Sequence, residues 1–193
     1  MARPWWMLKK QTGEPLAVSM VGVRLGDRLL AIGCSDPMLI AQLGAKTGLT
    51  GRAVAVDARD TVVAAAADVA TREGVLIETF TAPWNALPLD NDAFDVVIVR
   101  DVLPHLDRTK RAWCLVEAHR VLRSGGRCLV IDGTARKGIF PASRSEPVVS
   151  DYAAAGSAVG ILTTQGFKAA RVLAKREGLL FAEAVKPAVG PGS

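Results

Sequence analysis

Short runs of β-branched and other apolar residues alternate with helical stretches along most of this chain of 193 residues. Such alternation is typical of βαβ units, which build a mostly parallel sheet with helices on both faces. The runs begin roughly 20 to 35 residues apart, which is the length that a strand, a helix and two short loops require. The strands expected from this pattern cover residues 28–32, 53–57, 75–80, 94–99 and 128–132.

Capping residues, proline and glycine mark the ends of the expected helices. Asp60 and Asp107 are the expected N-caps of two helices, and Gly125 and Gly126 are expected to end the second of them. The expected helices cover residues 37–47, residues 60–73, a stretch after Asp107 and residues 152–165.

The chain closes with two more apolar runs, residues 170–176 and 179–186, which are joined by Glu177 and Gly178. Two such runs with a short connection predict a β-hairpin. Together with the earlier strands they predict an α/β fold: a seven-stranded, mostly parallel sheet with an antiparallel C-terminal hairpin and helices on both faces.

Composition excludes several classes of protein. With 50% hydrophobic and 22% charged residues, the chain can bury a large core and is not intrinsically disordered. Its apolar runs fall short of the roughly 20 residues that a membrane span needs, so we expect a soluble chain without a transmembrane segment. Three widely spaced cysteines without a secretory signal are typical of the reducing cytoplasm, and two histidines are too few for a His/Cys zinc site, so no metal is implied.

The net charge of +5 raises the question of nucleic acid. The basic residues do not form a run interleaved with aromatic residues, so we do not expect nucleic acid as the substrate. Anionic small molecules or a membrane surface suit the charge equally well.

Ligand sites in such sheets lie at the carboxyl ends of the strands, where the strand order reverses. The first expected strand runs into a tight turn that begins at Gly33, and the second ends at Asp57. An acidic residue about 20 residues after the glycine turn can accept hydrogen bonds from both hydroxyls of a ribose.

Three further segments carry a family resemblance: LPLDNDAFD (residues 87–95), the strand that follows it, and LVEAHRVLRSGGR (residues 115–127). In this order the chain resembles the class I S-adenosylmethionine-dependent methyltransferases, in the branch of the ubiquinone/menaquinone methyltransferases (methyltransferase type 11). The resemblance implies a Rossmann-like fold and S-adenosylmethionine as the cofactor. It also implies a methyltransferase-like domain over residues 21–187, an N-terminal segment or lid over residues 1–20, and a tail over residues 188–193.

The chain departs from this family at the cofactor turn. The family's GxGxG motif falls on Gly33, Ser35 and Pro37, so only the first glycine is present. Asp36 can replace a polar contact or repel the cofactor's carboxylate. The family's adenine-binding pair falls on Pro83 and Trp84. The resemblance implies cofactor contacts from Gly33, Cys34, Ser35, Asp57, Ala58, Pro83, Trp84 and Arg100.

Asp101 and His105 follow the fourth expected strand, where the resembled family lines the acceptor side of the pocket. Either side chain can take a proton from a hydroxyl or an acidic carbon. The alternative is that Asp101 caps the next turn and His105 packs at the sheet edge.

These features predict S-adenosylmethionine-dependent methyl transfer to a small or lipophilic acceptor. One alternative is a catalytically silent, methyltransferase-like binding or assembly protein, which the missing glycines and Pro83 favour. Another is an RNA methyltransferase with a basic groove beside Asp101. If the expected cofactor and acceptor pocket is open, a partner protein can complete it. In the N-terminal segment, Trp5 and Trp6 beside paired lysines suit peripheral membrane contact, a partner groove or a lid.

Overall fold

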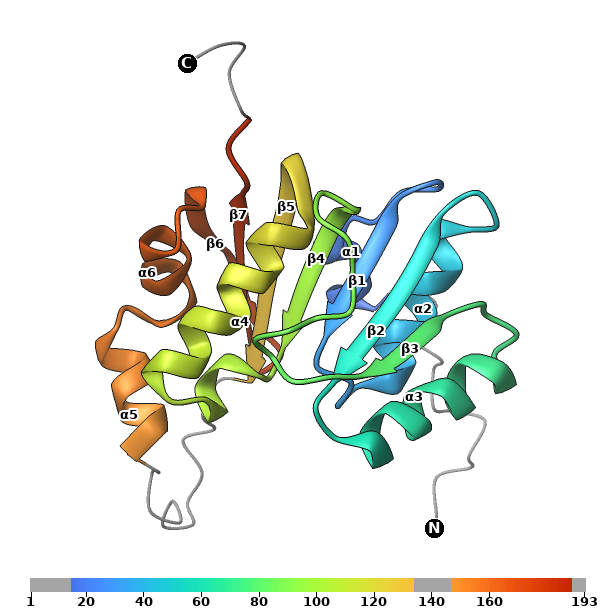
Figure 1. Cartoon of the computed structure of the whole chain (residues 1–193), viewed down its shortest axis with the longest axis horizontal. Helices are drawn as coiled ribbons and strands as arrows, with labels where there is room; N and C mark the ends of the chain where they lie inside the picture. Colours follow the sequence, from blue (N-terminus) through green and yellow to red (C-terminus); the bar gives the residue numbers. More distant parts are fainter. Residues whose placement is uncertain (1–14, 134–146, 189–193) are drawn as a thin grey trace, which may run out of the picture.

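The sheet of the computed structural model, which describes residues 15–133 and 147–188, has seven strands in the order β3-β2-β1-β4-β5-β7-β6 (Figure 1). Strands β1 to β5 are parallel, and β7 runs antiparallel to both β5 and β6. The predicted fold class is therefore confirmed. The strands are β1 Arg28–Ile32, β2 Arg52–Asp57, β3 Glu78–Thr81, β4 Phe94–Arg100, β5 Leu122–Gly133, β6 Lys168–Arg176 and β7 Leu179–Val185.

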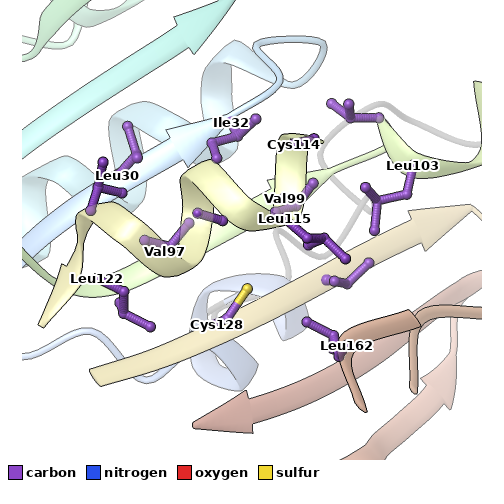
Figure 2. Close-up of a cluster of buried hydrophobic side chains, with 14 of the residues drawn as sticks. Leu30, Ile32, Val97, Val99, Leu103, Cys114, Leu115, Leu122, Cys128 and Leu162 are labelled. Atoms are coloured by element: carbon purple, nitrogen blue, oxygen red, sulfur yellow. The ribbon is translucent and has the colours of Figure 1, made fainter. Parts of the chain in front are cut away.

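Helices cover both faces of the sheet because successive residues of its strands point to opposite sides. Leu30 and Ile32 of β1 belong to the core beneath α4, which Figure 2 shows, whereas Leu29 and Ala31 face α1 and α2. In Figure 1, α4 lies in front of the sheet and α2 behind it. The helices are α1 Leu16–Val21, α2 Pro37–Thr47, α3 Asp60–Arg72, α4 Arg108–Val121, α5 Pro147–Ala154 and α6 Ser157–Thr164, and a 3₁₀ turn, η2, covers Leu103–His105.

Two of the predicted helix ends are wrong. Helix α4 begins after its predicted cap Asp107, but it ends at Val121, and Gly125 and Gly126 lie inside β5. The reason is that both glycines pair with the end of the hairpin: the N–H of Gly125 donates to the carbonyl of Lys186 at 3.0 Å, and the N–H of Lys186 donates to that of Gly126 at 2.9 Å. Asp60 is the first residue of α3, and its N-cap is Arg59.

The single helix predicted over residues 152–165 is two helices, α5 and α6. Gly156 separates them with a φ of +83°, a left-handed conformation that a continuous helix does not contain. The predicted hairpin is confirmed, and its two turn residues, Glu177 and Gly178, both have positive φ, as a type I′ turn requires.

Strand β1 lies between β2 and β4, so the strand order reverses beside it. The N–H of Gly33, directly after β1, donates to the carbonyl of Val56 at 2.8 Å, and the N–H of Asp101, directly after β4, donates to that of Ile131 at 3.0 Å. The carboxyl ends of β1, β2, β4 and β5 therefore lie level with one another and place the residues that follow them along one edge of the sheet. Within the described ranges, no helix has the length and apolar character needed to cross a membrane.

Candidate functional site at the carboxyl edge of the sheet

Gly33 forms the turn after β1 and has a φ of +94°. A Cβ atom at this position would lie 2.5 Å from both the carbonyl oxygen of Arg100 and Cγ2 of Val102. The glycine is thus required by the close approach of the ends of β1 and β4, independently of any ligand.

Asp36 and Pro37 start helix α2 in place of the family's later glycine. Asp36 is the N-cap, and its Oδ1 accepts a hydrogen bond from the N–H of Leu39 at 3.1 Å. Pro37 occupies the first turn, where a missing N–H costs no helical hydrogen bond. Oδ2 of Asp36 lies 3.7 Å from Nη2 of Arg100, so the turn also carries an ion pair to the end of β4.

Asp57 ends β2 and is fully buried. Its Oδ2 accepts hydrogen bonds from the N–H of Cys34 at 2.9 Å and from Nη2 of Arg59 at 3.0 Å. Its Oδ1 accepts from the N–H and from Nε of Arg59, both at 3.0 Å. Burial alone would raise the pKa of this carboxyl, but the hydrogen bonds from Arg59 and Cys34 outweigh it and hold the pKa below its usual value.

Cys34 and Ser35 differ in exposure although they are neighbours. Ser35 is exposed, whereas Cys34 is fully buried. Burial, and then the nearby charge of Asp57, raise the pKa of the Cys34 thiol to about 12. The thiol therefore stays protonated and acts as a small apolar side chain.

A cavity of about 240 Å³ opens beside Asp57 at this edge of the sheet. It brings together four of the predicted site residues: Ala58, Trp84, Asp101 and His105. Its complete lining is Ala58, Arg59, Trp84, Asp101, Val102, His105 and Leu106. In the described structure the other predicted site residues do not line this cavity. They are Gly33, Cys34, Ser35, Asp57, Pro83 and Arg100.

Asp101 has a φ of +49°, and one hydrogen bond and one ion pair hold its carboxylate. The N–H of Gly133 donates to Oδ1 at 2.6 Å, and Nη1 of Arg100 lies 3.0 Å from Oδ2. Asp101 thus links β4 to β5, and it does not cap the next turn within the described structure. His105 ends η2 and is exposed at the rim of the cavity.

Arg100 is mostly buried, with 12% of its side chain exposed. Its Nη1 donates to the carbonyl of Ile131 at 3.4 Å and pairs with Asp101, but its Nε is buried without a hydrogen-bond partner among the described residues. The guanidinium therefore ties the end of β4 to β5.

Two features of this edge are not apparent from the sequence. Asp132, near the end of β5, accepts a hydrogen bond from the hydroxyl of Tyr152 in α5, and burial raises the pKa of the Asp132 carboxyl to about 6. Arg59 covers Asp57. The sequence signal for this cover is a basic residue two positions after a strand-end aspartate, directly before the predicted helix cap Asp60.

A sequence model described as "Methyltransferase domain" matches residues 30–130, just over half of the chain. The chain belongs to this methyltransferase family. The matched range includes Gly33, Asp57, Trp84 and the end of β4.

Relatives of known name agree with this assignment. The chain is 27% identical over 117 residues to the ubiquinone/menaquinone biosynthesis C-methyltransferase UbiE of Marinomonas sp. (strain MWYL1), an alignment that covers 60% of this chain and 46% of the relative. It is 29% identical over 121 residues to the UbiE of Teredinibacter turnerae, covering 62% and 48%. The chain thus spans about half the length of these curated relatives.

The fold is similar to the crystal structure of a SAM-dependent methyltransferase from Aquifex aeolicus. The TM-score is 0.71 at 18% sequence identity, and the superposition covers 87% of this chain and 86% of the other. The predicted resemblance to class I methyltransferases is confirmed in both sequence and fold.

S-adenosylmethionine is the cofactor of this family, and the site suits its adenosine half. Asp57 is the acidic residue at the end of β2, and Ala58 and Trp84 line the cavity beside it. The carboxylate is covered only by Arg59 among the described side chains, and that side chain is 60% exposed and therefore able to move aside. Asp57 would hold the ribose, and Ala58 and Trp84 would contact the adenine.

Proposed function

We propose that this protein transfers a methyl group from S-adenosylmethionine to a small or lipophilic acceptor. The observation that carries the proposal is the buried Asp57 carboxylate beside a cavity at the point where the strand order reverses. The cofactor supplies an electrophilic methyl group, so the protein has to bind both reactants and hold them in line.

Val102 and Leu106, which line the cavity together with His105, give its acceptor side apolar walls, and this supports a lipophilic acceptor. The relatives' names as C-methyltransferases of ubiquinone and menaquinone biosynthesis support the same class. A partner protein that completes the pocket, contact with a membrane surface and a cytoplasmic location stay predictions from the sequence.

His105 is the better candidate for accepting a proton from the acceptor. Both oxygens of Asp101 are already engaged, by Gly133 and Arg100, so its carboxylate is suited to orienting groups in the cavity. His105 lies at the exposed rim, where an imidazole can act as a general base.

Calorimetric titration of the full chain with S-adenosylmethionine and S-adenosylhomocysteine tests the cofactor site. We expect saturable one-to-one binding that Asp57→Asn abolishes, because the amide has one acceptor oxygen where the ribose needs two. His105→Asn should bind the cofactor as the wild type does, since His105 lies on the acceptor side.

Absence of binding to both ligands by a chain with a cooperative thermal unfolding transition would refute the proposal. It would leave the catalytically silent binding protein as the better interpretation. Binding that survives Asp57→Asn unchanged would place the cofactor elsewhere.

A further inference from the structure

The Asp57 carboxylate is saturated by the protein itself. Each of its two oxygens accepts two hydrogen bonds from the described residues, and two of these four bonds come from the guanidinium of Arg59. The Nε and Nη2 atoms donate to Oδ1 and Oδ2 respectively, each at 3.0 Å, which is the bidentate geometry of an arginine–carboxylate pair.

The ribose of the cofactor needs the same edge of the carboxylate. The Nε–H and Nη2–H groups are two adjacent donors on one side of the guanidinium, and the two neighbouring hydroxyls of a ribose are likewise two adjacent donors. The backbone N–H groups of Cys34 and Arg59 occupy the other lone pairs of the carboxylate. The carboxylate therefore cannot accept hydrogen bonds from the Arg59 guanidinium and from the two ribose hydroxyls at the same time.

We infer that Arg59 is an internal competitor of the cofactor and sets the affinity of the site by occupying the ribose position of Asp57. This inference rests on the proposed function. When the cofactor binds, the Arg59 guanidinium leaves the carboxylate for water and the ribose hydroxyls take over its two hydrogen bonds. The buried carboxylate keeps its full set of donors in both states.

Exposure and cavity size support this exchange. Asp57 is 0% exposed whereas the Arg59 side chain is 60% exposed, so the guanidinium can swing into solvent without disturbing the core. Arg59 is also one wall of the cavity, whose volume of about 240 Å³ lies below the roughly 300–1,000 Å³ of typical small-molecule sites. Departure of Arg59 therefore both frees the carboxylate and enlarges the cavity.

Helix stability does not account for an arginine at this position. Arg59 is the N-cap of α3, and its side chain makes no capping hydrogen bond within the described part of the chain. A cation is unfavourable at a helix N-terminus, and serine or aspartate is preferred there. The Arg59 guanidinium is instead directed to Asp57.

The test compares the affinity for S-adenosylhomocysteine, which carries no sulfonium charge, between the wild type and two variants of the full chain. Arg59→Met keeps an unbranched chain in place of the arginine stem but removes its donors, and Arg59→Ser adds a helix cap, which protects the fold. A guanidinium that covers the carboxylate about 90% of the time lowers the apparent affinity about tenfold, so both variants should bind about tenfold more tightly.

Salt provides a second measurement. Added salt weakens an ion pair with an exposed partner, so the wild-type affinity should rise with ionic strength while that of Arg59→Met stays constant. Arg72→Met is the matched control, because Arg72 is exposed at the opposite end of α3, where its Nε donates to the carbonyl of Asp68. Its affinity should equal that of the wild type at every salt concentration.

Equal or weaker binding by both Arg59 variants, with a wild type that binds, would overturn the inference alone and would make Arg59 a cofactor contact or a bystander. If the wild type and both variants are folded and none binds, the proposed function fails together with the inference.

Discussion

Two buried aspartates at the same sheet edge have opposite protonation tendencies. Asp57 receives four hydrogen bonds and has a lowered pKa, whereas Asp132 receives one from Tyr152 and has a pKa raised to about 6. Oδ1 of Asp132 is buried and has no partner in the part of the chain that the structure describes. In Asp57 the hydrogen bonds outweigh the effect of burial on the pKa, whereas in Asp132 burial outweighs the single hydrogen bond.

Asp132 should make the stability of the fold depend on pH. In the folded protein the pKa of its carboxyl is about 6, against 3.8 for a free side chain, so the folded state binds more protons between these values. The free energy of unfolding therefore falls as the pH rises through this window. Asp132→Asn removes the titration, and its stability relative to the wild type should rise by up to about 3 kcal/mol between about pH 4 and about pH 7.

Urea unfolding at several pH values measures this difference. Asp68→Asn, on the exposed face of α3, is the control, and its stability relative to the wild type should change little with pH. A constant difference between Asp132→Asn and the wild type across the whole window would contradict the expectation.

At the scale of elements, the site depends on how closely the ends of β1 and β4 approach. Gly33 is the point of contact, since its missing side chain leaves room for the Arg100 carbonyl and for Val102. The single family glycine that the chain retains is thus the one that the packing of two strands requires. Ser35 and Pro37 occupy the positions of the family's two other glycines. They lie at the start of α2, where Asp36 is the N-cap and Pro37 stands in the first turn.

Gly33→Ala should therefore destabilise the fold more than a positive φ alone can explain. Gly166→Ala is the matched control, because Gly166 has a φ of +87° but an added Cβ there meets nothing within 4 Å in the described structure. We expect a loss of about 1 kcal/mol for Gly166→Ala and about 3 kcal/mol for Gly33→Ala, measured by chemical denaturation. Similar losses for the two variants would show that the strand ends separate at little cost.

At the scale of the whole molecule, one carboxylate adds an ion-pair network to the backbone pairing that joins the C-terminal hairpin to the rest of the fold. Glu183 of β7 pairs with Arg127 of β5 and with Arg171 of β6, each at 3.0 Å. Arg127 also donates to the carbonyls of Val21 and Gly22 at the end of α1, both at 3.1 Å. Segments more than a hundred residues apart in the chain are therefore held together at one point.

Glu183→Gln should weaken this connection while keeping the shape of the side chain. Glu183 is mostly buried, so we expect a loss of about 1–2 kcal/mol and a lower Tm. Arg171→Ala removes the partner that is 68% exposed and should cost under about 0.5 kcal/mol. Equal losses in thermal unfolding would mean that exposure does not govern this network.

The periodicity of apolar residues was sufficient to locate most elements. The expected strand 28–32 and helix 37–47 agree with β1 and α2 residue for residue. Strand β3 begins at Glu78 instead of at residue 75, because the N–H of Val75 still donates to the carbonyl of Ala70 at the end of α3. The local pattern of apolar residues does not predict a hydrogen bond that extends a helix end into the following loop.

The sequence by itself determined the layers of the fold, the family and the last residues of β1 and β2, because these follow from periodic burial and from local motifs. The tertiary structure alone decided which donors reach the buried carboxylates. Tyr152 reaches Asp132 of β5 from helix α5, and the Arg59 side chain folds back onto Asp57. The chemistry of a buried acid depends on the partners that packing brings to it, and sequence order does not specify those partners.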